Sequence, residues 1–310
     1  MDAGHVVDRP FRFGVVFTGN YGAREWSETA RRLEADGFST ILVADHYGNP
    51  MACGPLMLAA AAATTTLRVG SYVYNNDFRH PALLAKEAAT IDVLSGGRLE
   101  LGIGAGWANE EYEAVGVPFD PPPVRASRFE EGVEIVTRLL AGETVTFEGQ
   151  YYQIHEFEGL PVPVQSPVPL LIGGGGPRML RTAVERAHIV GFAPRALPQG
   201  GLESGDFASL EAKIERMETA IALSGRTDGG PERSILLFSV YPSMDAVPAE
   251  TWIPRELLPT SPYALIGDVE AMTETLQERR EKLGLSYFVC FDHDVERFTP
   301  LVRRLASTTC

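Results

Sequence analysis

The sequence predicts an α/β fold of the (β/α)8 TIM-barrel class with insertion segments, and three observations lead to this prediction. Short apolar segments alternate along the chain with amphipathic segments of helical length. The apolar segments are nearly continuous, which is typical of parallel strands that are covered on both faces. Outside one hairpin there are about eight such segments, and eight parallel strands close into a barrel. A doubly wound open sheet is the second interpretation.

The first half of the chain contains four strand–helix units in a row. Turn residues separate the units, such as Gly37 after the first helix and Ser95-Gly96-Gly97 after the third. The expected strands are Phe11–Phe17, Thr40–Ala44, Arg68–Tyr74 and Leu99–Ile103, and the expected helices are Trp26–Ala35, Pro55–Ala63 and His80–Leu94.

The second half continues the alternation and adds a hairpin and long loops. The hairpin is expected at Thr144–Ile154 with its turn at Glu148-Gly149, and long loops at Ala196–Asp206 and Ser243–Pro262. No segment has the composition of a linker, so residues 1–310 are interpreted as one domain. The expected strands are Leu170–Ile172, His188–Ala193, Ser234–Tyr241 and Tyr287–Phe291, and the expected helices are Val124–Leu140, Pro177–Arg186, Leu210–Leu223, Val269–Leu283 and Val295–Leu305.

Composition and charge favour a soluble, cytoplasmic enzyme. The net charge of -14 argues against a nucleic-acid or anionic-membrane partner, because both bind basic surfaces. The three cysteines, Cys53, Cys290 and Cys310, have neither metal-ligand nor disulfide-framework spacing, so we expect reduced thiols and no metal. The N-terminal segment lacks the apolar run of a signal peptide, and no apolar stretch is long enough to cross a bilayer.

Candidate site residues are those that end an apolar strand, because barrel active sites lie at the C-terminal ends of the strands. Asp45 and His46 end the second strand, and an imidazole there is suited to proton transfer near neutral pH. The alternative is that Asp45 caps a turn and His46 is solvated. Asn75-Asn76 after the third strand and Arg79-His80 before the next helix can likewise be a turn and a helix start.

Two glycine-rich segments also end strands. Gly102–Gly106 has the spacing G-x-G-x-G rather than that of a dinucleotide-binding fold, and a tight turn explains it equally well. Gly173–Gly176 is followed by Pro177 at a first helical position and then by Arg178, where the helix dipole disfavours a cation unless an anion lies nearby. The second segment therefore predicts an anion-binding loop.

The motifs on these strand ends, taken together, resemble the luciferase-like monooxygenase superfamily, most closely its coenzyme F420-dependent branch. No set of nucleophile, base and orienting group stands out, which favours chemistry carried by an organic cofactor. The matching segments are V-A-D-H at Val43–His46, R-H-P-A-L-L-A-K-E-A-A-T-I-D-V-L-S-G-G-R at Arg79–Arg98, L-G-I-G-A-G-W at Leu101–Trp107 and P-L-L-I-G-G-G-G at Pro169–Gly176.

This resemblance implies a barrel that binds a deazaflavin or flavin, acts as an oxidoreductase on a small organic molecule and forms a homodimer. It implies that Asp45 and His46 lie beside the ring and substrate as catalytic residues, and that a strand-three bulge, which often holds a cis peptide bond in the family, falls at Tyr72-Val73. The implied cofactor-binding residues are Tyr72, Val73, Asn75, Gly106, Trp107, Ala108, Asn109, Gly173, Gly174, Gly175, Gly176 and Arg178.

One departure from the family bears on the substrate. Sugar-phosphate dehydrogenases of the branch place a glutamate proton donor just after the strand-four glycines, where this chain has Trp107. We therefore expect a more apolar or planar substrate and hydride transfer at the deazaflavin C5, running as an F420H2-dependent reduction with His46 handling the proton. An FMN-dependent monooxygenase and a non-catalytic flavin-binding protein remain as alternatives.

Overall fold

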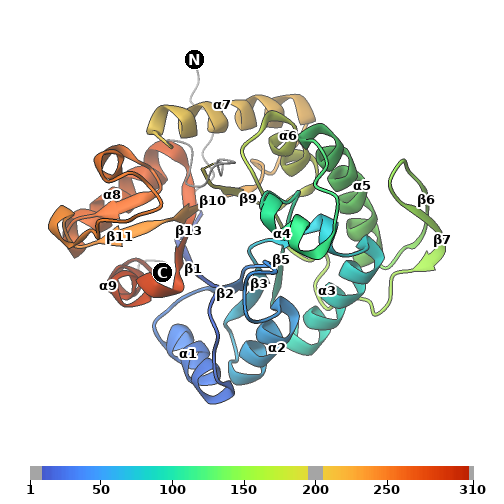
Figure 1. Ribbon diagram of the computed structural model, residues 1–310, viewed down its shortest axis with the longest axis horizontal. Helices are drawn as coiled ribbons and strands as arrows, with labels where there is room; N and C mark the ends of the chain where they lie inside the picture. Colours follow the sequence, from blue (N-terminus) through green and yellow to red (C-terminus); the bar gives the residue numbers. More distant parts are fainter. Residues whose placement is uncertain (1–8, 195–204, 307–310) are drawn as a thin grey trace. The chain divides into compact units, whose positions relative to one another are not determined.

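The computed structural model describes residues 9–194 and 205–306 (Figure 1). Contacts within the chain divide it into two compact units. Unit 1 comprises residues within 1–17, 33–40 and 173–310, and unit 2 comprises residues 18–32 and 41–172. Each unit is a set of parallel strands with helices that follow them in sequence.

Unit 2 contains the strands that lead to the first group of candidate residues. Its parallel pairings include Val69 opposite Leu99 and Leu101 opposite Leu170. Every residue of β5 is buried, as the continuous apolar pattern predicts. The strands are β2 (Thr40–Val43), β3 (Arg68–Ser71), β4 (Tyr74–Asn75), β5 (Leu99–Gly104) and β8 (Leu170–Gly173), and the helices are α1 (Ala23–Ala35), α2 (Cys53–Ala63), α3 (Pro81–Ser95), α4 (Asn109–Val115) and α5 (Pro122–Leu140).

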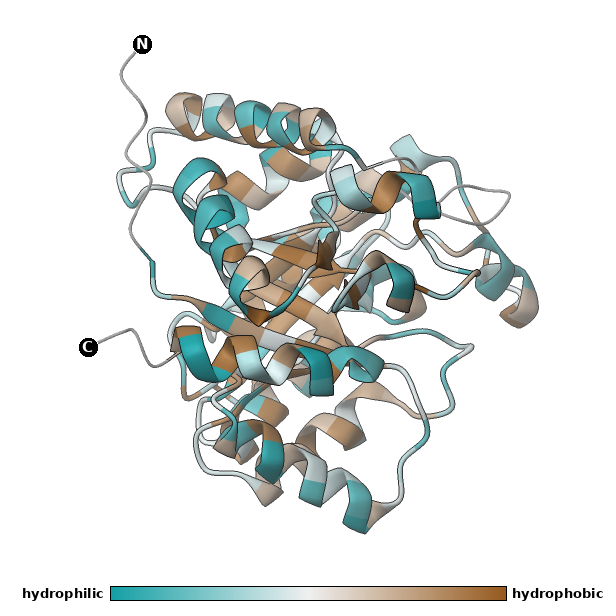
Figure 2. Cartoon of the chain, turned by 90° about the vertical axis from the view of Figure 1, so that its left-hand side faces the viewer, coloured by the Kyte–Doolittle hydropathy of each residue, from teal (hydrophilic) through white to brown (hydrophobic). Residues whose placement is uncertain are grey.

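Unit 1 contains four parallel strands in the order β1 (Arg12–Phe17), β13 (Leu285–Phe291), β10 (Glu232–Leu237) and β9 (Ile189–Phe192). An aromatic core ties the sheet to the last helix, because the rings of Phe13 and Phe298 meet edge to face at 5.6 Å. The strands are brown almost throughout in Figure 2, whereas the helices mix teal and brown. The helices are α6 (Pro177–Arg186), α7 (Phe207–Ser224), α8 (Val269–Leu283) and α9 (Val295–Leu305).

Two expected strands are interrupted, and these are corrections to the sequence analysis. The strand expected at Arg68–Tyr74 breaks at Tyr72-Val73, where the structure has a cis peptide bond between two non-proline residues, as the resemblance implied. The strand expected at Ser234–Tyr241 divides into β10 and β11 (Ser239–Tyr241), and β11 pairs with the short β12 (Ala264–Ile266). Neither break has a glycine or proline to signal it in the sequence.

The loop and hairpin predictions have mixed outcomes. The hairpin is present as β6 (Thr144–Glu148) and β7 (Gln153–Glu158), four residues longer than expected. The expected loop at Ser243–Pro262 contains two short 3-10 turns, Met244–Ala246 and Arg255–Thr260. Most of the loop expected at Ala196–Asp206 lies outside the described residues, but Asp206 caps α7 by accepting a hydrogen bond from the backbone N–H of Ser209 at 2.8 Å.

The fold class is that of the (β/α)8 barrel. The parallel strands β1, β2, β3, β5, β8, β9, β10 and β13 follow one another in sequence, and a helix lies after each of them before the next. The prediction of a single domain stays a prediction. No helix in the described part of the chain is long and apolar enough to span a membrane.

Candidate functional site

Asp45 lies directly after β2 and is held by an ion pair. The guanidinium of Arg79 donates to both carboxylate oxygens at 2.8 and 3.0 Å, and the backbone N–H of Asn75 donates to one of them at 3.0 Å. Burial lowers the pKa of Arg79, but its hydrogen bonds to Asp45 outweigh this and raise it. Asp45 therefore joins the end of β2 to β4 and to the segment just before α3.

His46, the next residue, pairs with Glu111 of α4. Its Nδ1 atom lies 3.0 Å from both carboxylate oxygens of Glu111. Glu111 has no proton to donate when ionised, so we assign the imidazole proton to Nδ1 and leave Nε2 for proton exchange with a substrate. The imidazole and the Trp107 ring meet at an angle of 78°, with their centroids 5.6 Å apart. The carboxylate of Glu111 thus fixes the orientation of the imidazole.

Glu111 and Arg79 are site residues that the sequence analysis did not assign. Glu111 could be recognised only as an acidic residue in the first turn of a helix, a position that acidic residues occupy for electrostatic reasons alone. Arg79 carries a usable signal, because a cation just before a helix N-terminus is disfavoured unless an anion neutralises it. The same argument singled out Arg178.

Gly102 and Gly104 of β5 are explained by packing. A Cβ atom on Gly102 would lie 2.1 Å from the backbone oxygen of Ser71, and one on Gly104 would lie 2.7 Å from the side chain of Val73. These glycines therefore allow the strand-three bulge at Tyr72-Val73 to approach β5. Both residues lie within β5, so packing between strands accounts for them rather than a tight turn.

Gly106 is different, because its backbone is left-handed and its missing side chain makes room for a polar network. Its φ is +75°, and a Cβ atom would lie 1.9 Å from the Tyr112 hydroxyl and 2.8 Å from Asn75 Oδ1. Asn75 Oδ1 accepts hydrogen bonds from the Tyr112 hydroxyl and the Asp77 backbone N–H, both at 3.0 Å. Buried polar atoms with these partners hold the turn in one conformation.

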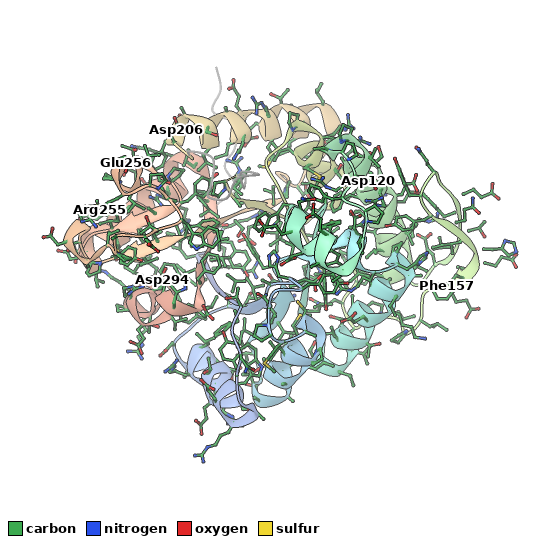
Figure 3. All side chains as sticks on the ribbon, in the orientation of Figure 1. Asp120, Phe157, Asp206, Arg255, Glu256 and Asp294 are labelled. Atoms are coloured by element: carbon green, nitrogen blue, oxygen red, sulfur yellow. The ribbon has the colours of Figure 1, made fainter. Side chains whose placement is uncertain are left out.

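The network continues into α5 through charged groups. Arg128 donates to both carboxylate oxygens of Asp77, at 2.7 and 2.8 Å, and to Asp120 at 2.7 Å, a residue labelled in Figure 3. After Gly106 the chain presents Trp107, which is 56% exposed, and Asn109, whose amide donates to Glu113 at 2.8 Å. Ala108 is the N-cap of α4 and offers no side-chain cap. The segment Gly106–Asn109 is thus a backbone-lined surface on a rigid support.

The glycine loop Gly173–Gly176 lies in unit 1, between β8 and α6. Gly174 has a φ of +140°, and its backbone N–H donates to the Gly191 oxygen at 3.1 Å. Gly176 is the N-cap of α6 and provides no side-chain cap, and Pro177 follows at the first helical position. Uncapped N–H groups at a helix start, approached without Cβ atoms, fit a phosphate group.

The sequence that forms this fold and these strand ends matches a known family. The model of the luciferase-like monooxygenase family matches residues 11–284, and the chain belongs to that family. An F420-dependent glucose-6-phosphate dehydrogenase of Kineococcus radiotolerans is 30% identical over 244 residues, which cover 74% of this chain and 69% of the relative. The enzyme of the same name from Microbacterium testaceum is 33% identical over 307 residues, covering 94% and 88%.

A solved structure with the same fold comes from an archaeal enzyme. The F420-dependent tetrahydromethanopterin reductase of Methanopyrus kandleri superposes with a TM-score of 0.80 at 20% identity, covering 96% of this chain and 98% of the other. This similarity confirms the fold class.

Proposed function

We propose that the chain is an F420-dependent oxidoreductase that transfers a hydride between the deazaflavin C5 and a small organic substrate, acting as a reductase. The pairing of His46 with Glu111 at the end of a barrel strand is the observation that carries this proposal. Sequence relatives that share most of the chain are named as F420-dependent enzymes, which supports the cofactor.

Each unit, taken by itself, has residues suited to one group of such a cofactor. In unit 2 the left-handed Gly106 and the bulge at Tyr72-Val73 give the backbone-lined surface that a planar ring requires. In unit 1 Gly173–Gly176 would hold the phosphate, together with the first turn of α6 at Arg178. When bound, the cofactor supplies or accepts the hydride.

The remaining chemistry belongs to the side chains of unit 2. A substrate that gains a hydride also needs a proton, which we assign to His46 Nε2. Glu111 holds Nδ1 of the imidazole and so keeps the ring in one orientation. Asp45 takes the role of a positioning residue, because its ion pair with Arg79 fixes the backbone that precedes His46.

Trp107 indicates the class of substrate. Its side chain is 56% exposed and its ring centroid lies 5.6 Å from that of His46, and Tyr47, the next residue after His46, is 51% exposed. Exposed aromatic side chains near the proton donor favour an apolar or planar organic molecule. A sugar phosphate fits a surface of aromatic side chains less well.

A homodimer is the assembly we propose, through a surface named here the α3 patch. It consists of exposed apolar side chains on α3 and on residues 157–164: Leu83, Val93, Leu94, Phe157, Leu160, Val162 and Val164. Phe157, labelled in Figure 3, and Leu160 share a shallow pocket with Ala85 and Ala89 of α3. Exposed apolar side chains that cluster on a surface favour an interface, and a second copy supplies a patch of the same chemistry.

A cytoplasmic location is proposed on the state of the cysteines. Cys53 and Cys290 are both buried free thiols. Burial, followed by the nearby carboxylate of Asp45, raises the pKa of the Cys53 thiol, so this thiol stays neutral and unreactive. Reduced cysteines of this kind are the rule in the cytosol.

A fluorescence titration tests the cofactor assignment. Purified protein is titrated with F420 and, separately, with flavin mononucleotide, and the quenching of tryptophan emission gives each dissociation constant. We expect tight binding of F420 and weak binding of flavin mononucleotide. A preference for flavin mononucleotide, with oxygen consumed during turnover, would establish the monooxygenase instead. Binding of neither would refute both.

A further inference from the structure

We propose that Ser71, the last residue of β3, is a positioning residue whose hydroxyl holds the bulge at Tyr72-Val73 against β5. This inference rests on the proposed function and deepens it, because under that function the bulge forms part of the surface on which the deazaflavin ring would lie. A single serine at a strand end gives no local signal of its partners, so the sequence alone does not single it out.

The bulge contains one residue more than the strand that it faces. Gly70 lies opposite Glu100 of β5. Further along, Tyr74 lies opposite Ile103. Four steps from residue 70 to residue 74 therefore match three steps from residue 100 to residue 103. One extra residue on one strand is a β-bulge, and it interrupts the backbone hydrogen bonds between the two strands.

The hydroxyl of Ser71 makes the hydrogen bonds that the bulge interrupts. Ser71 Oγ donates to the backbone oxygen of Gly102 at 2.8 Å and accepts from the Gly102 N–H at 3.0 Å. The N–H of Leu101, one residue earlier, points the other way and donates to Pro169 at 2.9 Å. Gly102 thus directs both of its backbone polar groups to Ser71. The Ser71 side chain is buried, so water does not compete for these bonds.

The bulge that Ser71 holds is also fixed from its other side. The backbone N–H of Tyr72 donates to the oxygen of Val43, the last residue of β2, at 2.9 Å. On the β5 side the Val73 side chain lies where a Cβ atom on Gly102 would be only 3.0 Å away. Backbone bonding to β2 and the Ser71 hydroxyl on β5 together set the position of the bulge. Loss of the hydroxyl removes the hydrogen bonds on the β5 side, so the bulge can shift.

The phosphate-free deazaflavin chromophore tests this role directly, because it carries the ring without the phosphate. Dissociation constants of the chromophore and of F420 are measured by fluorescence titration for wild-type protein and Ser71→Ala. We expect Ser71→Ala to weaken the binding of both by the same factor, about ten-fold, since both carry the ring. At saturating chromophore, the absorbance band of the bound ring should also differ from that in the wild type.

Ser95→Ala is the matched control. Ser95, the last residue of α3, is also buried, and its hydroxyl also makes one hydrogen bond in each direction. It donates to the Asp92 oxygen and accepts from the Arg98 N–H, both at 3.1 Å. Chemical denaturation should show similar losses in the free energy of unfolding for the two alanine variants, because each loses a buried hydroxyl with two hydrogen bonds. Only Ser71→Ala should change ring binding and the absorbance band.

Ser71→Cys is a second variant for the case that Ser71→Ala does not fold. Its sulfur occupies a similar volume but makes only weak hydrogen bonds. Ring binding should weaken in the same direction as in Ser71→Ala, and by a smaller factor. Where Ser71→Ala does not fold, an unchanged ring affinity in Ser71→Cys overturns the proposal.

The outcomes distinguish the inference from the function on which it rests. Equal ring affinity in wild type and a folded Ser71→Ala overturns the role of Ser71 and leaves the proposed function standing. An equal loss of ring affinity in Ser71→Ala and Ser95→Ala also overturns that role, because lower stability would explain both. Failure of the wild type to bind F420 at all overturns the proposed function and the inference together.

Discussion

At the scale of single residues, the hydrogen bonds of His46 determine what its imidazole can do. Nδ1 is held by Glu111, so only Nε2 can exchange a proton with a substrate. Asp45, one residue earlier, has both oxygens engaged by Arg79. Under the proposed function, these two adjacent residues therefore take separate roles, His46 in proton transfer and Asp45 in positioning.

Removal of the Glu111 charge tests this division. We expect Glu111→Gln to lower turnover roughly ten- to a hundred-fold, within the range that general acid–base catalysis contributes. The dissociation constant of F420 should be nearly unchanged, because Glu111 acts through His46. Steady-state turnover and fluorescence titration measure the two effects. Glu110→Gln, at the exposed neighbouring position, is the matched control. Equal turnover in Glu111→Gln and wild type would show that the carboxylate has no role in positioning His46.

The sequence indicated Asp45 and His46 as candidate site residues, but it did not indicate the side chains with which they pair. Asp45 and His46 could be found because titratable residues directly follow an apolar strand. Their partners Arg79 and Glu111 lie 34 and 65 residues further along the chain, just before α3 and on α4. Pairing over such separations depends on how the helices pack, which a single sequence does not encode in any local pattern.

At the scale of elements, the turn between β5 and α4 depends on the absence of a side chain at Gly106. Gly106 combines a left-handed φ with a gap that the Tyr112 hydroxyl fills. The network behind it reaches α5 through Asp77 and Arg128. The turn that carries Gly106–Asn109 is therefore supported by Tyr112 of α4, Asp77 and Arg128 of α5.

Alanine substitution separates the two requirements at Gly106. Gly116, the C-cap of α4, has nearly the same φ, +72°, but nothing within 4 Å of a Cβ atom. Gly116→Ala should cost only the backbone term, about 1–2 kcal/mol in the free energy of unfolding. Gly106→Ala should cost more, because Tyr112 and Asn75 must also move. Chemical denaturation of the two variants measures the difference. Equal losses in the free energy of unfolding would mean that Tyr112 and Asn75 adjust to the added methyl group at no cost.

The buried phenols of this region predict how stability depends on pH. Burial is the main cause of the raised pKa values of Tyr112 and Tyr152. The pKa of Tyr152 is raised to about 12. An unfolded tyrosine ionises near pH 10, so between about pH 10 and 12 the folded state binds more protons than the unfolded state. The stabilisation from these groups is present below pH 10 and is lost as the pH rises through this window.

Denaturation at a series of alkaline pH values measures this effect. The free energy of unfolding should fall by up to about 1.4 kcal/mol per pH unit for each such group. Tyr152→Phe should lessen the slope, because a phenylalanine cannot ionise in either state. Tyr47→Phe, at an exposed position, is the control and should leave the slope unchanged. If Tyr152→Phe and wild type show the same slope, the phenol of Tyr152 is not shielded from ionisation.

Helices with clear ends were predicted closely, and short elements were not. The helices at 177–186, 269–283 and 295–305 have the bounds expected from the sequence. Proline at the start of α6 and Asp268 before α8 are local signals that fix those ends. By contrast, β12 has three residues and exists through its pairing with β11, so no local periodicity could reveal it.

At the scale of the whole molecule, charge and apolar surface act in opposite directions on self-association. A net charge of -14 keeps copies apart in solution. The α3 patch is named for its apolar side chains, and Lys86 beside its pocket and the exposed Glu158 are charged. A symmetric dimer through this patch removes the apolar side chains from water without bringing many like charges together.

Charge placed in the α3 patch should therefore separate the copies. Wild-type protein is expected at twice the chain mass of 33.7 kDa in light scattering after size-exclusion chromatography. Leu94→Glu with Leu160→Glu places carboxylates on both sides of a self-complementary interface, where like charges cost several kcal/mol, and should give a monomer. Leu223→Glu is the control, because Leu223 is 83% exposed on α7, outside the patch. The light-scattering mass of Leu223→Glu should stay at that of the dimer. A monomeric wild type, or a double variant that remains dimeric, would exclude the α3 patch as the dimer interface.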